Sequence, residues 1–175
     1  MKEKAQLPDG IDVEYKDGVL RVTGDGEEVE KVLEHPKIQV EINDDEVVFS
    51  TDSTKRDVTS ILGTFRSHTE NMVEGVQEPH VYTMKGVYAH FPMTIKQESG
   101  KVLIENFMGE RAPREIDIMD GVDVQIDGDD LKLTGANKDS VAQTAARIEQ
   151  ACKKGDRDPR TFQDGVYIVK GDRSE

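Results

Sequence analysis

The chain has 175 residues, of which 35% are hydrophobic and 5% aromatic, and its formal net charge is −13. It contains no apolar run of the roughly 20 residues that a membrane-spanning helix needs. Its single cysteine, Cys152, excludes an internal disulfide and fits a reducing compartment. We therefore expect a cytoplasmic protein without a membrane partner, with modest cores built mainly from Val, Ile and Leu.

The first half of the chain predicts two hairpins followed by a helix. An Asp-Gly turn at 17–18 precedes an alternating run at 19–22, and a second turn rich in Asn and Asp lies inside 42–50. Two-residue turns of this kind between alternating runs are typical of β-hairpins. From 53 to 75, apolar residues recur every three or four positions, which predicts an amphipathic helix.

The second half repeats the same order of elements. A Ser-Gly turn stands at 99–100, the run 126–134 matches 42–50, and 137–152 has the helical spacing of 53–75. A period of more than 80 residues indicates two whole domains, because solenoid repeats recur at about 20–50 residues.

The predicted fold class is therefore α+β, with two tandem copies of one module, each an antiparallel β-sheet packed against one long α-helix. We place the first, acidic domain at 1–79 and the second at 80–175, with a predicted strand at 81–92 opening the second copy. The charge is polarised along the chain. Residues 1–52 carry a net charge of −9, whereas residues 147–173 carry +2.

No catalytic, metal or cofactor site is predicted. The four histidines stand at spacings that match no metal-ligand signature. The sequence at 24–26, Gly-Asp-Gly, lacks the third glycine and the strand–turn–helix setting of a dinucleotide loop, so it predicts a plain turn. Cys152 falls on the apolar face of its predicted helix and is expected in the core.

A candidate binding segment follows the second helix and has no counterpart in the first copy. Arg157 and Arg160 flank Pro159, which restricts the backbone, and planar guanidinium groups suit phosphates and base edges. Phe162 and Tyr167 follow, and aromatic rings in this setting can stack on bases or on arginine. A surface loop whose aromatic side chains pack on the sheet explains the same residues, and this alternative stays open.

Two further features favour the second copy as the one that faces a polyanion. Gly165 permits a tight turn and a close approach of backbone N–H groups to a sugar-phosphate chain. Arg111 and Arg114 form a second basic loop, whereas the equivalent segment of the first copy, 27–30, is acidic.

Four ordered blocks of the chain carry a family resemblance over essentially its whole length. They are ILGTFRSH with NMVEGV (61–76), VYAHFP (87–92), IENFMGE (104–110) and RTFQDGVYI (160–168). In these blocks the chain resembles the sixth large-subunit ribosomal protein family in bacterial numbering (nine in eukaryotes), in its archaeal form.

The resemblance implies a structural constituent of the large ribosomal subunit that binds 23S rRNA near the stalk base and the factor-binding region, mainly through the second domain. Neighbouring ribosomal proteins and nearby translation factors are the other implied partners, and no enzymatic activity is implied. The implied RNA contacts are Arg157, Arg160, Phe162, Gln163, Gly165 and Tyr167, with Lys153, Lys154, Arg111 and Arg114 as phosphate partners.

The charge of −13 departs from the basic character of many family members and is expected for a halophilic archaeon, although a non-halophilic acidic protein fits too. The alternative function is a free two-domain adaptor that binds proteins through exposed sheet edges and binds no RNA.

Overall fold

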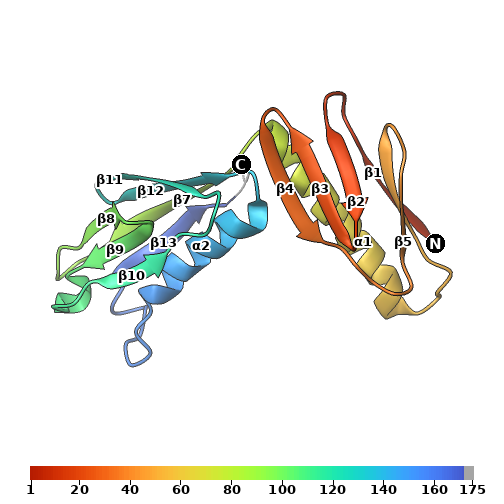
Figure 1. The fold of residues 1–175 in the computed structure, drawn as a ribbon. Coiled ribbons are helices and arrows are strands. Elements are labelled where there is room, and N and C mark those ends of the chain that lie inside the picture. Colours follow the sequence, from red (N-terminus) through yellow and green to blue (C-terminus); the bar gives the residue numbers. More distant parts are fainter. Residues whose placement is uncertain (172–175) are drawn as a thin grey trace. The chain divides into compact units, whose positions relative to one another are not determined.

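The computed structural model describes residues 1–171. The chain divides into two units, Met1–Pro79 (unit 1) and His80–Glu175 (unit 2). Figure 1 shows that each unit combines strands with one long helix, and each is described here by itself.

Unit 1 contains two three-stranded antiparallel sheets and one helix. The first sheet has the order β1-β6-β5 and the second the order β2-β3-β4. The elements are β1 (Lys2–Gln6), β2 (Asp12–Lys16), β3 (Val19–Gly24), β4 (Glu27–Val32), β5 (Gln39–Ile42), β6 (Glu46–Ser50) and α1 (Arg56–Gln77).

The hairpin turns of both units follow from their residues. Asp17 and Gly18, between β2 and β3, have φ values of 50° and 78°, and the Ser-Gly turn at 99–100 has 51° and 75°. Positive φ at both central residues matches a type I′ turn, whose twist suits a two-residue hairpin. The Gly-Asp-Gly sequence at 24–26 also lies at such a turn, between β3 and β4, as predicted.

Helix α1 packs its apolar stripe into the core of unit 1. Leu62 is fully buried, and the rings of Phe65 and Phe49 meet edge to face with centroids 5.7 Å apart. The helix continues two residues beyond its predicted end at Gly75. The cause is that Pro79, and not Gly75, stops it, since the residue before a proline is disfavoured in a helix.

Unit 2 repeats this arrangement and adds one strand. Its sheets have the orders β10-β9-β8 and β11-β12-β7-β13, so β13 pairs with the edge of β7 that is unpaired in the equivalent β1. The elements are β7 (His80–Val87), β8 (Thr94–Glu98), β9 (Lys101–Glu105), η1 (Phe107–Gly109), β10 (Arg114–Asp117), β11 (Asp123–Asp127), β12 (Asp130–Gly135), α2 (Lys138–Ala151) and β13 (Gly165–Lys170).

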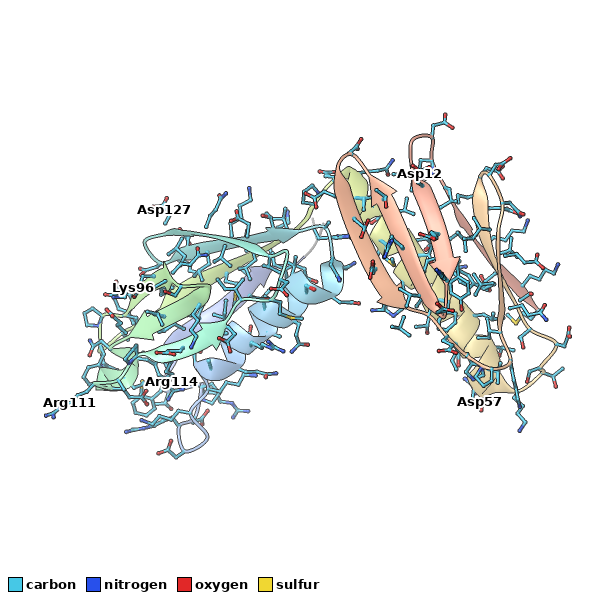
Figure 2. All side chains as sticks on the ribbon, viewed as in Figure 1. Asp12, Asp57, Lys96, Arg111, Arg114 and Asp127 are labelled. Atoms are coloured by element: carbon cyan, nitrogen blue, oxygen red, sulfur yellow. The ribbon has the colours of Figure 1, made fainter. Side chains whose placement is uncertain are left out.

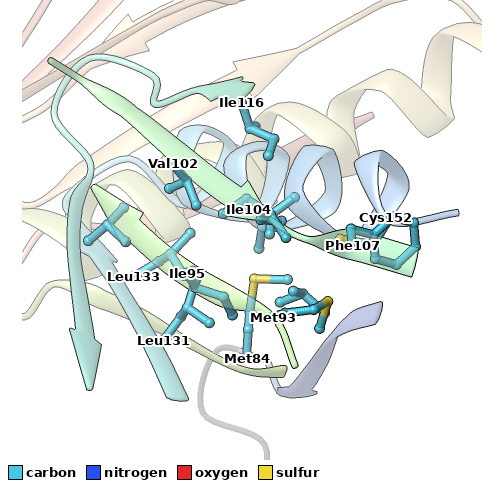
Figure 3. Packing of buried hydrophobic residues seen from close by; sticks show 14 of the residues in the cluster. Met84, Met93, Ile95, Val102, Ile104, Phe107, Ile116, Leu131, Leu133 and Cys152 are labelled. Atoms are coloured by element: carbon cyan, nitrogen blue, oxygen red, sulfur yellow. The ribbon is translucent and has the colours of Figure 1, made fainter. Parts of the chain in front are cut away.

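The core of unit 2 lies between its two sheets and α2. Val141, Ala145 and Ile148 of α2 are fully buried in one apolar cluster with residues of both sheets. Cys152 belongs to this cluster as predicted, and Figure 3 shows it next to Phe107 at one end. Burial raises the pKa of the Cys152 thiol to about 11.

The predicted fold class, two tandem α+β modules with antiparallel sheets and one helix each, is confirmed. Besides the longer α1, two details differ from the sequence-based expectation. The strands of each unit form two sheets instead of one, and the strand expected at 81–92 ends at Val87. It ends there because the next backbone groups leave the ladder, with the Ala89 N–H donating to the Asp164 carboxylate at 3.1 Å.

Candidate nucleic-acid interface

The 153–163 loop, which joins α2 to β13, is organised by Asp158. The Asp158 backbone carbonyl accepts hydrogen bonds from the N–H groups of Thr161 at 3.0 Å and Phe162 at 2.8 Å. Its carboxylate Oδ1 accepts another from the Arg160 N–H at 2.9 Å, as Asp side chains do in turns. The loop therefore holds the exposed Arg160 side chain on an ordered turn.

Phe162 is half-buried between two neighbours. The Arg157 guanidinium carbon lies 4.5 Å from the centroid of its ring, within cation–π range, and the His90 ring lies at 6.3 Å. Arg157 itself is exposed, so it stays accessible to a ligand while it contacts the ring. The ring thus lies against an arginine of its own loop, and stacking of Phe162 on a base stays a prediction.

Arg114 makes a network within the protein. Its guanidinium donates to both carboxylate oxygens of Glu110, at 2.9 and 2.7 Å, and to the backbone carbonyl of Ala151 in the last turn of α2. It also lies 4.4 Å above the Phe107 ring. These hydrogen bonds lower the pKa of Glu110 and raise that of Arg114. Arg114 thus braces the carboxyl end of α2, and its role as a phosphate partner stays a prediction.

The other three predicted phosphate partners are Lys154, Lys153 and Arg111. Lys154 Nζ lies 3.8 Å from Glu110 Oε1, whereas Lys153 and Arg111 are exposed. Figure 2 shows Arg111 extending outward from the loop next to η1. The structure therefore brings Arg111 and the cations of the 153–163 loop to the same end of unit 2.

Gly165 and Tyr167 form the start of β13, next to Gln163. The Tyr167 hydroxyl donates to the backbone carbonyl of Gln163 at 2.9 Å, and burial raises its pKa, with nearby anionic groups adding to the shift. A Cβ at Gly165 would lie 3.2 Å from the Tyr167 hydroxyl oxygen. Gly165 is buried and paired with Val87, so the glycine makes room for the Tyr167 ring, a different reason from the tight turn expected.

A pocket of about 330 Å³ opens between the end of α2 and the 153–163 loop. Its walls are largely apolar, and its cationic members come from the loop. The apolar walls include Phe107, Met108, Phe162 and Tyr167, and the cations are Lys153, Lys154 and Arg157. The predicted aromatic and basic residues thus meet around one concave site.

Asp164 lines the same pocket and is only 5% exposed. Its Oδ1 accepts the Ala89 N–H, whereas Oδ2 is buried and has no hydrogen-bond partner among residues 1–171. A buried polar atom without a partner costs about 1–3 kcal/mol. Asp164 therefore contributes a buried, unsatisfied carboxylate oxygen to the lining of this site.

Sequence reasoning missed Glu110, Asp164 and the exposed aromatic residues of 88–91. Glu110 stands four residues before Arg114, a spacing that hints at an ion pair only if the intervening turn is known. Asp164 precedes a glycine and resembled an ordinary turn residue. The segment 88–91 belongs to one of the blocks that carry the resemblance. Its place in the site comes from the contact between the rings of His90 and Phe162, which joins it to the 153–163 loop.

Within the described part of the chain, no group of three His, Cys, Asp or Glu side chains is placed to hold a metal ion. No helix in that part is long and apolar enough to cross a membrane.

Comparison with known proteins places the chain in one family. A family model described as ribosomal protein L6 matches residues 7–79 and again residues 91–165. The large ribosomal subunit protein uL6 of Haloarcula marismortui is 43% identical over 94% of this chain and 93% of its own length. The uL6 proteins of Methanospirillum hungatei (43%, over 97% and 95%) and Natronomonas pharaonis (39%, over 97% and 96%) are similarly close. The two matches of one model agree with the duplicated fold, and the chain belongs to the ribosomal protein L6 family.

Proposed function

We propose that the protein is a structural constituent of the large ribosomal subunit in the cytoplasm, and that it binds 23S-type rRNA near the stalk base and the factor-binding region. Neighbouring ribosomal proteins are its other partners, and translation factors act nearby. The observation that carries this proposal is the match to large-subunit proteins over nearly the full length of both chains. Members of this family are structural proteins, not enzymes.

Unit 2 is the proposed RNA-binding unit, through its 153–163 loop. Arg157, Arg160, Lys153 and Arg111 are exposed there and suit the anionic phosphates. Lys154 is shared between the RNA and Glu110. An ordered turn presents the arginines, which lowers the entropy cost of holding them in place when RNA binds.

The remaining predicted residues act from within the loop and its pocket. Gln163 is exposed and offers its side-chain amide to a base or sugar. Phe162 and Tyr167 form pocket walls, Gly165 makes room for Tyr167, and Arg114 positions the end of α2. In this proposal Arg114 supports the interface and also remains a phosphate partner.

The first test is sedimentation of a native cell extract at high salt and Mg²⁺, with this chain followed by mass spectrometry. We expect it to travel with the large subunit in near-stoichiometric amount. A chain that stays at the top of the gradient would overturn the proposal and favour the free adaptor.

The second test locates the RNA-binding surface by charge reversal. Arg157→Glu with Arg160→Glu should weaken binding to purified 23S-type rRNA about tenfold or more, because two phosphate contacts become repulsive. The matched control is Lys16→Glu with Lys37→Glu, which changes the net charge equally on exposed positions of unit 1. Equal losses from both double variants would contradict the assignment to unit 2.

A further inference from the structure

The pocket beside the 153–163 loop has the size, lining and charge of a site for one nucleobase. Its volume of about 330 Å³ lies near the lower end of small-ligand sites, which span about 300–1,000 Å³. Aromatic and thioether side chains form its walls, and three cations stand around it together with the carboxylates of Glu149 and Asp164. A flat apolar base with an anionic phosphate attached matches both parts of this lining.

Asp164 gives this pocket a preference among bases. A carboxylate accepts hydrogen bonds and donates none. Its Oδ1 already accepts the Ala89 N–H, whereas Oδ2 has no hydrogen-bond partner in the part of the chain that the structure describes. A ligand that brings N–H donors to this carboxylate would satisfy an atom that the folded protein leaves unsatisfied.

Guanine fits this requirement better than the other three bases. Its Watson–Crick edge carries two neighbouring donors, the N1–H and the N2 amino group. In adenine and cytosine, the amino donor stands beside a ring-nitrogen acceptor, which a carboxylate repels. In uracil a single N–H lies between two carbonyl oxygens. Bases taken out of a stack are commonly recognised along this edge.

We propose that the pocket receives one unpaired guanine nucleotide of the rRNA, with Asp164 accepting from its Watson–Crick edge and Lys153, Lys154 and Arg157 facing its phosphates. This inference rests on the proposed function and names the specificity-determining residue of the same surface. Because Oδ2 is nearly without exposed surface, the base reaches it after the 153–163 loop shifts outward. Turn hydrogen bonds, the Arg157–Phe162 contact, the Lys154–Glu110 ion pair and the Tyr167–Gln163 hydrogen bond hold that loop, and none of these is a strand pairing.

The test uses the full chain and four labelled pentaribonucleotides that differ only in their central base, flanked by adenines. Binding is followed by fluorescence anisotropy at low salt. We expect the guanine-centred oligonucleotide to bind about 5- to 10-fold more tightly than the other three, which is the lower end of the range for a good base-edge contact. A thioguanosine at the central position should crosslink to the peptide that contains Phe162 or Tyr167.

Asp164→Asn should reduce this preference to less than about twofold, because the new amide places a donor against the guanine donors. Its amide oxygen can still accept the Ala89 N–H, and an unchanged thermal midpoint would show that the variant folds. The matched control is Asp156→Asn, which removes the same charge from an exposed position of the same loop and should leave the preference unchanged.

The outcomes separate this inference from the proposed function. If the wild-type chain shows no base preference, or if Asp164→Asn keeps it, the guanine pocket is overturned. If rRNA binding then still depends on Arg157 and Arg160, the proposed function stands without the pocket. If the chain binds no rRNA at all, both are overturned.

Discussion

At the scale of single residues, Cys152 illustrates how packing suppresses chemistry. With a pKa of about 11, only about one thiol in a thousand is ionised at pH 8, compared with roughly a quarter for a free cysteine. We expect the native protein to react with a disulfide reagent at pH 8 at least about 100-fold more slowly than the urea-unfolded chain. Fast reaction of the native thiol would mean that the end of α2 opens frequently.

Glu110 provides a residue-scale prediction that depends on pH. The hydrogen bonds from Arg114 lower its folded pKa below the usual value of 4.5, so its stabilising effect is present above about pH 4.5 and is lost as the pH falls through the lower folded pKa. Glu110→Gln should therefore cost about 1 kcal/mol near neutral pH, a small figure because the pair is partly exposed.

This pH dependence can be checked by urea denaturation followed by tyrosine fluorescence, since three of the four tyrosines lie in unit 2. The stability difference between wild type and Glu110→Gln should be constant from pH 5 to 7 and should shrink below pH 4.5. Asp120→Asn, at an exposed position of the same unit, serves as the control. A difference in stability that grows as the pH falls would contradict a stabilising role of the Arg114–Glu110 pair.

At the scale of elements, the two helices begin in different ways. The Asn137 side chain accepts hydrogen bonds from the N–H groups of Asp139 at 3.0 Å and Ser140 at 3.4 Å, whereas Lys55, at the start of α1, makes no such bond. We expect Asn137→Ala to destabilise unit 2 by about 1 kcal/mol and Lys55→Ala to have little effect on unit 1. Hydrogen exchange of the first-turn amides measures this, and equal effects at both sites would refute the capping argument.

The elements also show which parts of the structure could be predicted. Turns such as 17–18 and 99–100, and the periodicity of both helices, depend on neighbouring residues, so the sequence alone identified them. The pairing of β13 with β7 joins residues about 80 positions apart and has no local signal. The split of each unit into two sheets also depends on which distant strands pair, and the early end of β7 depends on Asp164, so both appeared only in the structure.

The same limit explains the candidate site. The basic and aromatic character of the 153–163 loop could be predicted from its composition. The lack of any catalytic motif agrees with the family to which the chain belongs. The intramolecular use of Arg114 depends on where α2 ends in space, since Ala151 is 37 positions away. Likewise, Asp164 is distinguished by burial, which no residue type reveals.

At the scale of the whole molecule, the negative charge is concentrated in one unit. Unit 1 carries nine basic and 19 acidic residues, a net charge of −10, whereas unit 2 carries 14 and 17, a net charge of −3. The duplicated fold has therefore retained its topology while the two copies diverged in charge. A chain this acidic can still bind RNA if its exposed cations gather at one end of unit 2 and the long-range repulsion from unit 1 is screened by salt.

This arrangement predicts a shallow salt dependence of RNA binding. With about four phosphates neutralised by exposed cations of the site, a plot of log K against log salt concentration should have a slope of about −3 to −4. The double variant Arg157→Glu with Arg160→Glu should reduce the magnitude of this slope to about 2 or below. The control, Lys16→Glu with Lys37→Glu, should leave the slope unchanged. Filter-binding titrations between 0.1 and 1 M salt, about the range over which screening shortens from 10 to 3 Å, would measure all three.

A steep slope in the wild-type chain would require cations outside the 153–163 loop and Arg111, and so a larger RNA-binding surface than unit 2 offers here. A shallow slope that the arginine variant does not change would place the phosphate contacts elsewhere. If the slope is shallow and its magnitude falls by about two in that variant, these two arginines neutralise phosphates directly, since the charge of unit 1 is the same in both chains.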